Sequence, residues 1–284
     1  MKRIVLSTIL AMSLSLSLSL ARAADWRLDA ETGVLYDSNL SNSDRSSDVE
    51  DDWAWKTNLR LGNGFQLSRD LRLSLAADLH GLLWDHYHGF NEIGGGAVAA
   101  LRYRFGLGRQ APWILLEERI GYDGFRESER NGWDETLQLR GGISLAERVA
   151  LEAGYTLQNF AAIEEFWNLQ GHRGDVRLLI ELTSSLQVAL GYSYRDGDII
   201  AYAVPPRPDL VRLAPDRQPV STFGTDPLYI AYPIRARTHA VSISAAYAVS
   251  RHFFVQLAYE YAATSHDPLE YENHFVEAKA GFSY

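Results

Sequence analysis

Charged side chains recur at every second position in several stretches of the chain, for example at Arg102 and Arg104 and at Asp175 and Arg177. Successive side chains of a β-strand point to opposite faces, so this spacing places the charges on one face. A wall of charged side chains can select small solutes in a pore, or it can fill a narrow space with salt bridges. Both signs occur in similar number, which favours the salt bridges. The residues that we assign to this wall are Arg27, Lys56, Arg60, Arg72, Asp78, Arg102, Arg104, Arg140, Glu152, Asp175, Arg177, Glu181, Glu260, Glu277 and Lys279.

Two further groups of residues have side chains suited to chemistry. His86 and His88 with Asp85 are the residue types of a metal site or a general base. The acidic residues between positions 44 and 52 offer carboxylate oxygens of the kind that bind calcium. However, the histidines are scattered along the chain, and the acidic run has no ordered ligand spacing. We therefore predict no catalytic residue, no metal site and no cofactor.

The elements that position these residues begin after a leader. Residues 1–23 contain two basic residues near the start, then a serine-diluted apolar stretch and an Ala-Arg-Ala site. This is the pattern of a secretory signal peptide, so we predict a leader over 1–23 and one domain over 24–284. Removing the three basic residues of the leader lowers the net charge from −9 to −12. Such an acidic chain is a poor candidate for nucleic-acid binding, which depends on clustered basic residues.

Beyond the leader, apolar and polar residues alternate with a period of two, which is the pattern of β-strands. No apolar run there approaches the roughly 18 residues of a membrane-spanning helix. We predict about twelve strands, over residues 26–36, 53–61, 71–80, 93–105, 112–122, 137–145, 149–158, 175–182, 186–194, 241–247, 253–261 and 276–284.

The segment over 112–122 departs from this alternation. Its apolar residues run into Glu117, Glu118 and Arg119, so either register places a charge on the apolar face. An extra residue in the strand would redirect the side chains, and we therefore predict a β-bulge there.

The links between the predicted strands are alternately short and long. Short links lie at 68–70, 146–148, 183–185 and 250–252, and long polar links lie at 38–52, 123–134, 159–171 and 196–237. The last long link holds seven of the nine prolines, and it could constrict a pore, touch a ligand or move freely. Short turns at one end, long loops at the other and an even number of strands are typical of outer-membrane β-barrels.

The cost of burying charge decides which face meets lipid. A charged side chain at the bilayer midplane costs about 2–4 kcal/mol, so the charged wall must face the interior. We therefore predict an all-β, transmembrane, antiparallel up-and-down barrel. A soluble β-sandwich would expose the charged face instead. It would not explain the aromatic residues near both ends of the strands, which are Trp53, Trp55, Trp84, Tyr122, Trp133 and Tyr194 at the long loops and Trp26, Tyr103, Phe105, Trp113, Phe253 and Phe282 at the short turns.

The end of the sequence resembles the C-terminal signal of proteobacterial outer-membrane β-barrels. It reads Phe282, Ser283 and Tyr284, preceded by apolar residues at every second position. The resemblance implies that Phe282 and Tyr284 form the signal read by the barrel-assembly machinery. It also implies that the protein lies in the bacterial outer membrane, in contact with the lipid bilayer and lipopolysaccharide.

These features leave three functions open. The first is a narrow porin-like channel or a structural, surface-interacting barrel without enzymatic activity. The second is a hydrolase of lipid or lipopolysaccharide, although the His-x-Ser pattern of an outer-membrane phospholipase does not occur. The third is the translocation barrel of an export system.

Overall fold

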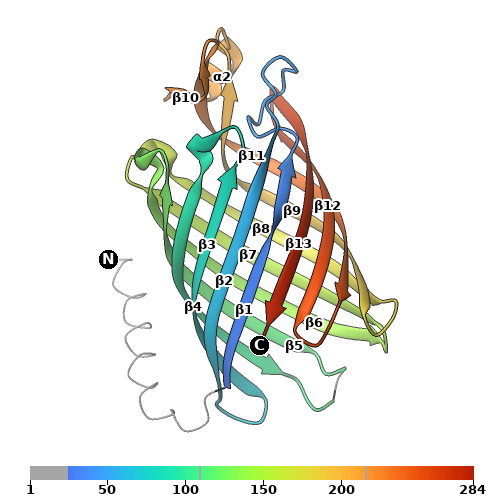
Figure 1. The fold of residues 1–284 in the computed structure, drawn as a ribbon. Helices are drawn as coiled ribbons and strands as arrows, with labels where there is room; N and C mark the ends of the chain where they lie inside the picture. Colours follow the sequence, from blue (N-terminus) through green and yellow to red (C-terminus); the bar gives the residue numbers. More distant parts are fainter. Residues whose placement is uncertain (1–24, 109, 215) are drawn as a thin grey trace.

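The protein is a closed antiparallel β-barrel of 12 strands (Figure 1). The computed structural model describes residues 25–108, 110–214 and 216–284. The fold class and the strand number predicted from the alternation are therefore confirmed. The predicted leader over 1–23 lies outside the described residues.

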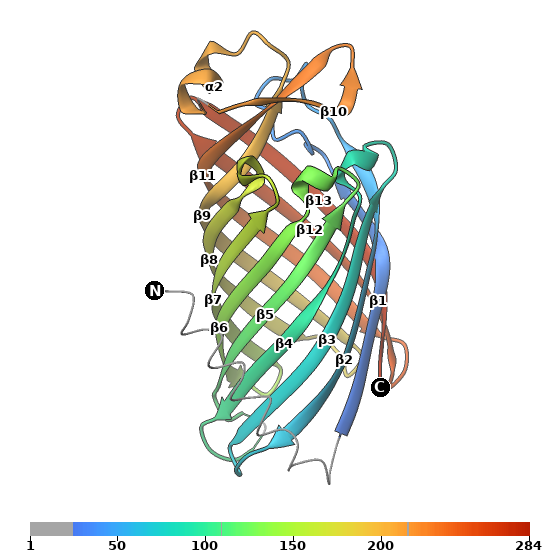
Figure 2. The same cartoon turned by 90° about the vertical axis from the view of Figure 1, so that its left-hand side faces the viewer.

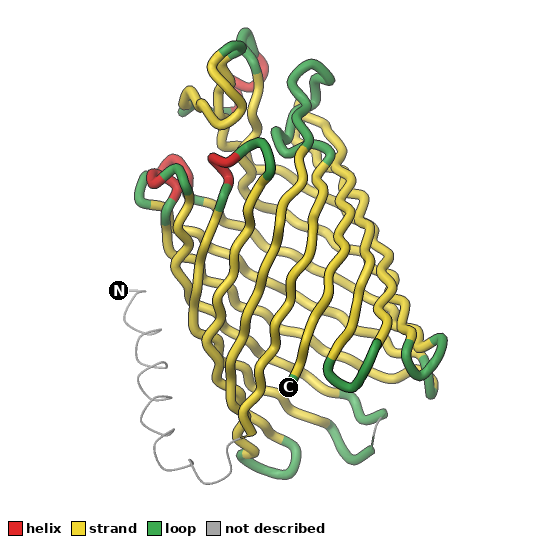
Figure 3. Tube along the Cα trace, viewed as in Figure 1, coloured by secondary structure: helices red, strands yellow, loops and turns green. Residues whose placement is uncertain are grey.

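The strands are long and regular, and they tilt across the barrel as Figure 3 shows. Their bounds are β1 Asp25–Asp37, β2 Asp52–Gln66, β3 Leu71–Trp84, β4 Glu92–Arg104, β5 Trp113–Phe125, β6 Gly132–Ala146, β7 Val149–Ala162, β8 Leu169–Glu181, β9 Leu186–Ala203, β10 Gln218–Thr225, β11 Leu228–Ala248, β12 Phe253–His266 and β13 Leu269–Ser283.

Two strand pairings close the barrel. β1 pairs with β13, and β9 pairs with β11 over the register from Ile230 opposite Ala203 to Tyr247 opposite Leu186. β10 pairs only with β11 and lies outside the ring of strands, above its outer end (Figure 2). Every strand of the barrel therefore has a partner on both sides, which a sheet in hydrocarbon requires.

The apolar residues of the barrel wall point outward. Leu79 is 61% exposed and Ile93 68% exposed, whereas the neighbouring Asp78 is only 5% exposed. Lipid hydrocarbon is the medium that can cover such a band, because it removes apolar side chains from water as a protein core would. The barrel thus carries its apolar surface on the outside and its polar surface within.

The predicted β-bulge in the fifth strand is wrong. β5 pairs with β4 and β6 in unbroken register. Glu117 and Arg119 lie on the inner face, where Glu117 pairs with Arg60 and Arg119 pairs with Asp78. Glu118 lies on the outer face with Ile114 and Leu116. The two inner ion pairs explain this register, because a bulge would turn one of these charges toward lipid. A register shift occurs instead where β6 meets β7.

The outer links are shorter than predicted, because the strands run further than their apolar alternation. They span residues 38–51, 85–91, 126–131, 163–168, 204–227 and 267–268. Three of them contain short 3-10 turns, which are η1 His88–Phe90, η2 Ser128–Arg130 and η3 Glu165–Trp167. The predicted link over 196–237 is in large part strand, since β9 extends to Ala203 and β11 begins at Leu228.

The link over 204–227 contains the short helix α2 (Pro208–Leu213) and β10. Pro208 stands in the first turn of α2, where its missing N–H leaves no bond unmade. None of the helices in the described part of the chain is long and apolar enough to cross a membrane.

Most of the predicted aromatic collar lies on the outer face, but two members point inward. Trp26 and Trp133 are exposed, whereas Trp84 is 6% exposed. Trp113 lies beneath the guanidinium of Arg102, whose Cζ atom is 4.6 Å from the centre of the Trp113 ring. Alternate residues of a strand point to opposite faces, and Trp84 and Trp113 occupy positions that share the inner face with charged residues.

Leu59 points outward, so its substitution tests which face of β2 meets lipid. We expect Leu59→Arg to destabilise the barrel by about 2–4 kcal/mol, because it places a cation near the middle of the hydrocarbon. The side chain of the adjacent Asn58 points into the polar interior, so Asn58→Arg should destabilise the barrel much less. Denaturant unfolding of both variants in lipid vesicles measures the difference, and equal costs would contradict the assignment of the two faces.

Candidate functional site

The polar inner surface of the barrel is the candidate functional site, and ion pairs there join strands that are not neighbours. Arg60 of β2 lies 3.8 Å from Glu117 of β5, and Arg173 of β8 lies 3.9 Å from Glu260 of β12. Two strands that are separated in the sheet can bring side chains together only across the interior. These contacts therefore run through the lumen.

Other members of the predicted wall pair along the inner surface. Lys279 lies 2.9 Å from Glu31, and Arg177 lies 3.2 Å from Glu152. The wall pairs also include Lys56 with Glu277 at 3.0 Å, Arg140 with Asp175 at 4.0 Å and Arg27 with Asp29 at 2.8 Å. Among the described residues, Arg72, Arg102, Arg104 and Glu181 form no ion pair.

Two cavities of the lumen each have four arginines among their lining residues. One, of about 380 Å³, lies among β1–β5 and has Arg27, Arg60, Arg72 and Arg102 with Asp29 and Glu117 in its wall. The other, of about 410 Å³, lies on the far side and has Arg140, Arg173, Arg177 and Arg195 with Asp175. In each cavity the guanidinium groups outnumber the carboxylates. The surroundings therefore favour anions.

A compact ionic cluster lies closer to the outer end, and its central cation was missed by the sequence analysis. Arg119 contacts Asp78 on β3 at 3.1 Å and also pairs with Asp134 on β6. The charge run around Arg119 disguised the strand alternation, so its inner direction was not evident.

Glycines make this long reach possible. Gly96 of β4 stands between Asp78 of β3 and Gly121 of β5 in the sheet. A Cβ atom at Gly121 would lie 2.7 Å from the guanidinium of Arg119, which is closer than real contacts allow. The run of glycines at 94–96 is therefore the sequence signal that could have indicated side chains meeting over β4.

The outer end of the barrel is covered by two links, residues 38–51 and 204–227, which we call the outer cap. Ser41 O accepts a bond from Tyr202 N–H at 2.8 Å, and Asp48 accepts one from Val204 N–H at 3.2 Å. Tyr229 O–H donates to Glu50 at 2.6 Å. Buried apolar clusters on both faces of the β9–β11 hairpin hold the cap, one with Leu210 of α2 and the other with Trp167 of η3.

Arg207 is the ionic centre of the cap. Its side chain is fully buried and contacts Asp44 at 2.8 Å and Asp209 at 2.7 Å. The bond from the Arg207 guanidinium lowers the pKa of the Asp209 carboxyl to about 2. Arg207 therefore links the two segments of the cap by charge.

A second buried arginine lies below the cap. The guanidinium of Arg130 packs 4.6 Å from the ring centre of Phe90 and 4.5 Å from that of Trp167, and it donates to the hydroxyl of Tyr202. Cation–π contacts of this kind gain strength away from water. With the bond to Tyr202, they connect the turns η1, η2 and η3 to the outer end of β9.

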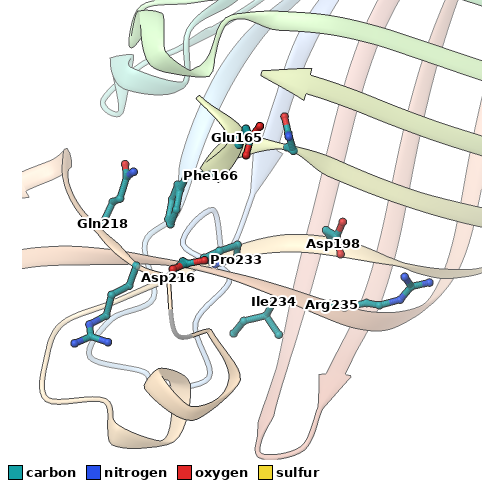
Figure 4. A pocket seen from close by; sticks show the side chains of 10 residues that line it. Glu165, Phe166, Asp198, Asp216, Gln218, Pro233, Ile234 and Arg235 are labelled. Atoms are coloured by element: carbon teal, nitrogen blue, oxygen red, sulfur yellow. The ribbon is translucent and has the colours of Figure 1, made fainter. Parts of the chain in front are cut away.

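A cleft of about 800 Å³ lies beside the cap (Figure 4). Its walls are Asp216, Arg217 and Gln218 of the cap, Pro233 to Arg235 of β11, and Glu165 and Phe166 of η3. The cleft therefore separates the cap from the turn between β7 and β8.

The rim histidines do not gather into one site. The His86 ring is 3.0 Å from Asp52, and the His88 ring is 2.9 Å from the carbonyl of Trp84. His274 contacts the Tyr259 hydroxyl at 2.8 Å on the outer face of the barrel. In the part of the chain that the structure describes, no hydrogen bond joins a histidine ring to a serine hydroxyl.

Comparison with known proteins identifies the class. No protein-family model matches the chain, and no curated protein matches it in sequence. An outer-membrane channel from Pseudomonas putida F1 matches in structure with a TM-score of 0.63 and 11% identity, covering 93% of this chain and 97% of that chain. The Pseudomonas putida toluene transporter TodX also matches, with a TM-score of 0.47 and 10% identity over 94% of this chain and 91% of that chain. The KdgM porin matches with a TM-score of 0.46 and 9% identity over 90% of this chain and 99% of that chain.

At these identities the likeness concerns the fold. The chain has the fold of the β-barrels of the bacterial outer membrane. Its architecture is that of a porin-like channel barrel.

The central position of Arg119 can be tested by its removal. We expect Arg119→Met to destabilise the barrel by about 3–5 kcal/mol, because it leaves the buried Asp78 and the partly buried Asp134 without their cation. Lys56→Met is the control, since Lys56 is half exposed and its pair with Glu277 should contribute less than about 1 kcal/mol. Denaturant unfolding in vesicles compares the two variants, and a similar loss in both would refute a central role for Arg119.

The lowered pKa of Asp209 predicts how the cap responds to acid. A lowered pKa stabilises the cap above the ordinary carboxyl pKa of about 4, and this stabilisation is lost as pH falls toward about 2. Pepsin cleavage within residues 204–227, normalised to that of the unfolded chain, should therefore rise over this range. Arg207→Gln should already be cleaved readily at pH 4, and a variant as resistant as the natural chain would contradict the role of Arg207.

Proposed function

We propose that the protein is a narrow outer-membrane channel for small anionic solutes, with its outer entrance covered by the cap. The observation that carries this proposal is the pair of lumen cavities with four arginines each and fewer carboxylates. Rings of arginine select anions in pores by direct charge attraction. The residues of the predicted wall are the groups that would contact the solute.

The cap favours a gated channel over a permanently open pore. Arg207 joins its two segments through Asp44, and Tyr229 of β11 donates to Glu50 of the first segment. The side chains of Arg207 and Tyr229 are both buried. Opening the entrance requires these polar groups to separate, which costs free energy in a dry environment. We therefore expect a small conductance at rest.

The leader, the assembly signal and the lipopolysaccharide contact belong to the same proposal. Residues 1–23 would direct export, and Phe282 and Tyr284 would be recognised during barrel assembly. Phe282 packs against Phe253 with 5.0 Å between ring centres, and Tyr284 is largely exposed at the end of β13. Lipopolysaccharide would contact the outward-facing basic residues Arg235 and Arg237 near the outer rim.

Planar-bilayer recordings test the channel. In a KCl gradient we expect a reversal potential that favours chloride, because the lumen cavities are rich in arginine. The double variant Arg72→Gln and Arg102→Gln should reduce this preference, since neither residue has an acidic partner whose charge it would expose. Arg237→Gln removes a charge on the outer face, outside the lumen, and as the control it should leave the reversal potential unchanged.

The same recordings separate the channel from a purely structural barrel. Arg207→Gln should raise the conductance at neutral pH by loosening the cap. A purified barrel that never conducts, with or without this substitution, would rule out the channel and leave a structural or surface-interacting role. A preference for potassium would refute the anionic solute class.

A further inference from the structure

A histidine and two carboxylates from three adjacent strands meet at the outer end of the lumen. His80 Nε2 lies 3.0 Å from Glu92 Oε1 and 3.2 Å from Asp123 Oδ1. Gly94 stands between His80 and Asp123 in the sheet, and a Cβ atom there would come within 2.6 Å of the imidazole and 2.2 Å of the carboxylate. The missing side chain at Gly94 thus allows these three groups to converge.

One carboxylate oxygen of this group makes no hydrogen bond, although His80 Nε2 lies 3.2 Å and Arg119 Nη2 lies 4.0 Å from it. Asp123 is 7% exposed, and its Oδ1 atom is buried without a hydrogen bond. The single N–H that His80 has at Nε2 can serve only one acceptor, and it bonds with Glu92. A buried, unpartnered carboxylate oxygen is costly, so this position favours a cation that both carboxylates can share.

The charges around the group favour an added cation as well. Asp78 and Asp134 lie beside it, and Arg119 is the cation placed among these carboxylates. Arg130 and Arg195 lie further along the wall of the adjoining cavity, which measures about 300 Å³. An imidazole that binds an ion through Nε2 carries no proton there and no net charge, so the four carboxylates then exceed Arg119 by three charges. A divalent ion would reduce this excess to one.

We propose that His80, Glu92 and Asp123 bind one divalent transition-metal ion of the zinc class. Ligand atoms 3.0–3.2 Å apart match the separation expected around an ion with bonds of about 2.0–2.1 Å. A mixed set of one imidazole and two carboxylates suits zinc better than calcium or magnesium, which prefer oxygen alone. The adjoining cavity, lined by Glu92 and Asp123, leaves room for a water molecule as a further ligand.

Asp78 would orient the imidazole from behind. Its Oδ2 atom lies 3.6 Å from His80 Nδ1, and a small shift would bring it within hydrogen-bond distance of the Nδ1 proton when Nε2 binds the ion. Metal-binding histidines generally carry such an acceptor on their second nitrogen. Arg119, whose Nη2 is 3.3 Å from Nδ1, would then turn away and keep its bonds to Asp78 and Asp134.

A second cluster of similar residues provides the contrast. Asp52, Asp85 and His86 also lie within reach of one another at the outer rim. Asp52 already accepts bonds from the N–H groups of Trp53, His86 and Tyr87. Its oxygens are therefore occupied in holding the turn, and this cluster carries no proposal.

Zinc titration of the purified barrel in detergent tests the site. Calorimetry should show one zinc ion per chain, and X-ray absorption should show one imidazole nitrogen among oxygen ligands at about 2.0–2.1 Å. Glu92→Gln and Asp123→Asn should each weaken binding at least tenfold, and Asp78→Asn should weaken it by about 10–100-fold. His86→Gln is the matched control and should bind zinc like the natural chain.

Several results would overturn the site. They are an absence of zinc binding, unchanged affinity in Glu92→Gln and Asp123→Asn, or loss of binding in His86→Gln. Far-UV circular dichroism verifies that each variant retains the barrel, and if one does not, the remaining carboxylate variant decides. The measurement needs no conductance, so its outcome is independent of the proposed channel function.

Discussion

The structure depends on one constraint, which is that every backbone polar group inside the hydrocarbon must find its partner within the protein. The pairing of β1 with β13 and of β9 with β11 meets it by leaving no strand of the barrel with a free edge. Once the sheet is closed, the two faces of each strand have unequal surroundings. Apolar side chains such as Leu79 meet lipid, and charged side chains such as Asp78 can only turn inward.

Inside the barrel, the arrangement of charges follows from where side chains are missing. Gly94 and Gly96 clear the inner face of β4, so residues of β3 and β5 meet over it. The result is the cluster around Arg119 and the group around His80, both toward the outer end. Further toward the turns and across the lumen, arginines predominate in the cavities. The lumen is therefore divided into an acidic part and a basic part, although the total numbers of charges are similar.

Among the described residues, the buried apolar clusters lie at the outer end. The barrel wall needs none, because lipid takes its place. The cap and the β9–β11 hairpin lie beyond the apolar band, so they bury Tyr202, Tyr232 and Leu210 against one another as a soluble protein does. Arg207 and Arg130 are enclosed within this region by acidic or aromatic partners.

The sequence by itself determined the period of two and the number of strands, because alternation reports local geometry. The same alternation predicts an inner position for residues such as Arg60 and Lys279. It also indicated the uneven lengths of the links. Only the tertiary structure decided the register of β5, the true length of β9 and the inward direction of Trp84. It alone brought His80, Glu92 and Asp123 together, because contacts across strands depend on register and on which neighbour is glycine. The cap likewise joins segments about 160 residues apart, a distance over which alternation carries no information.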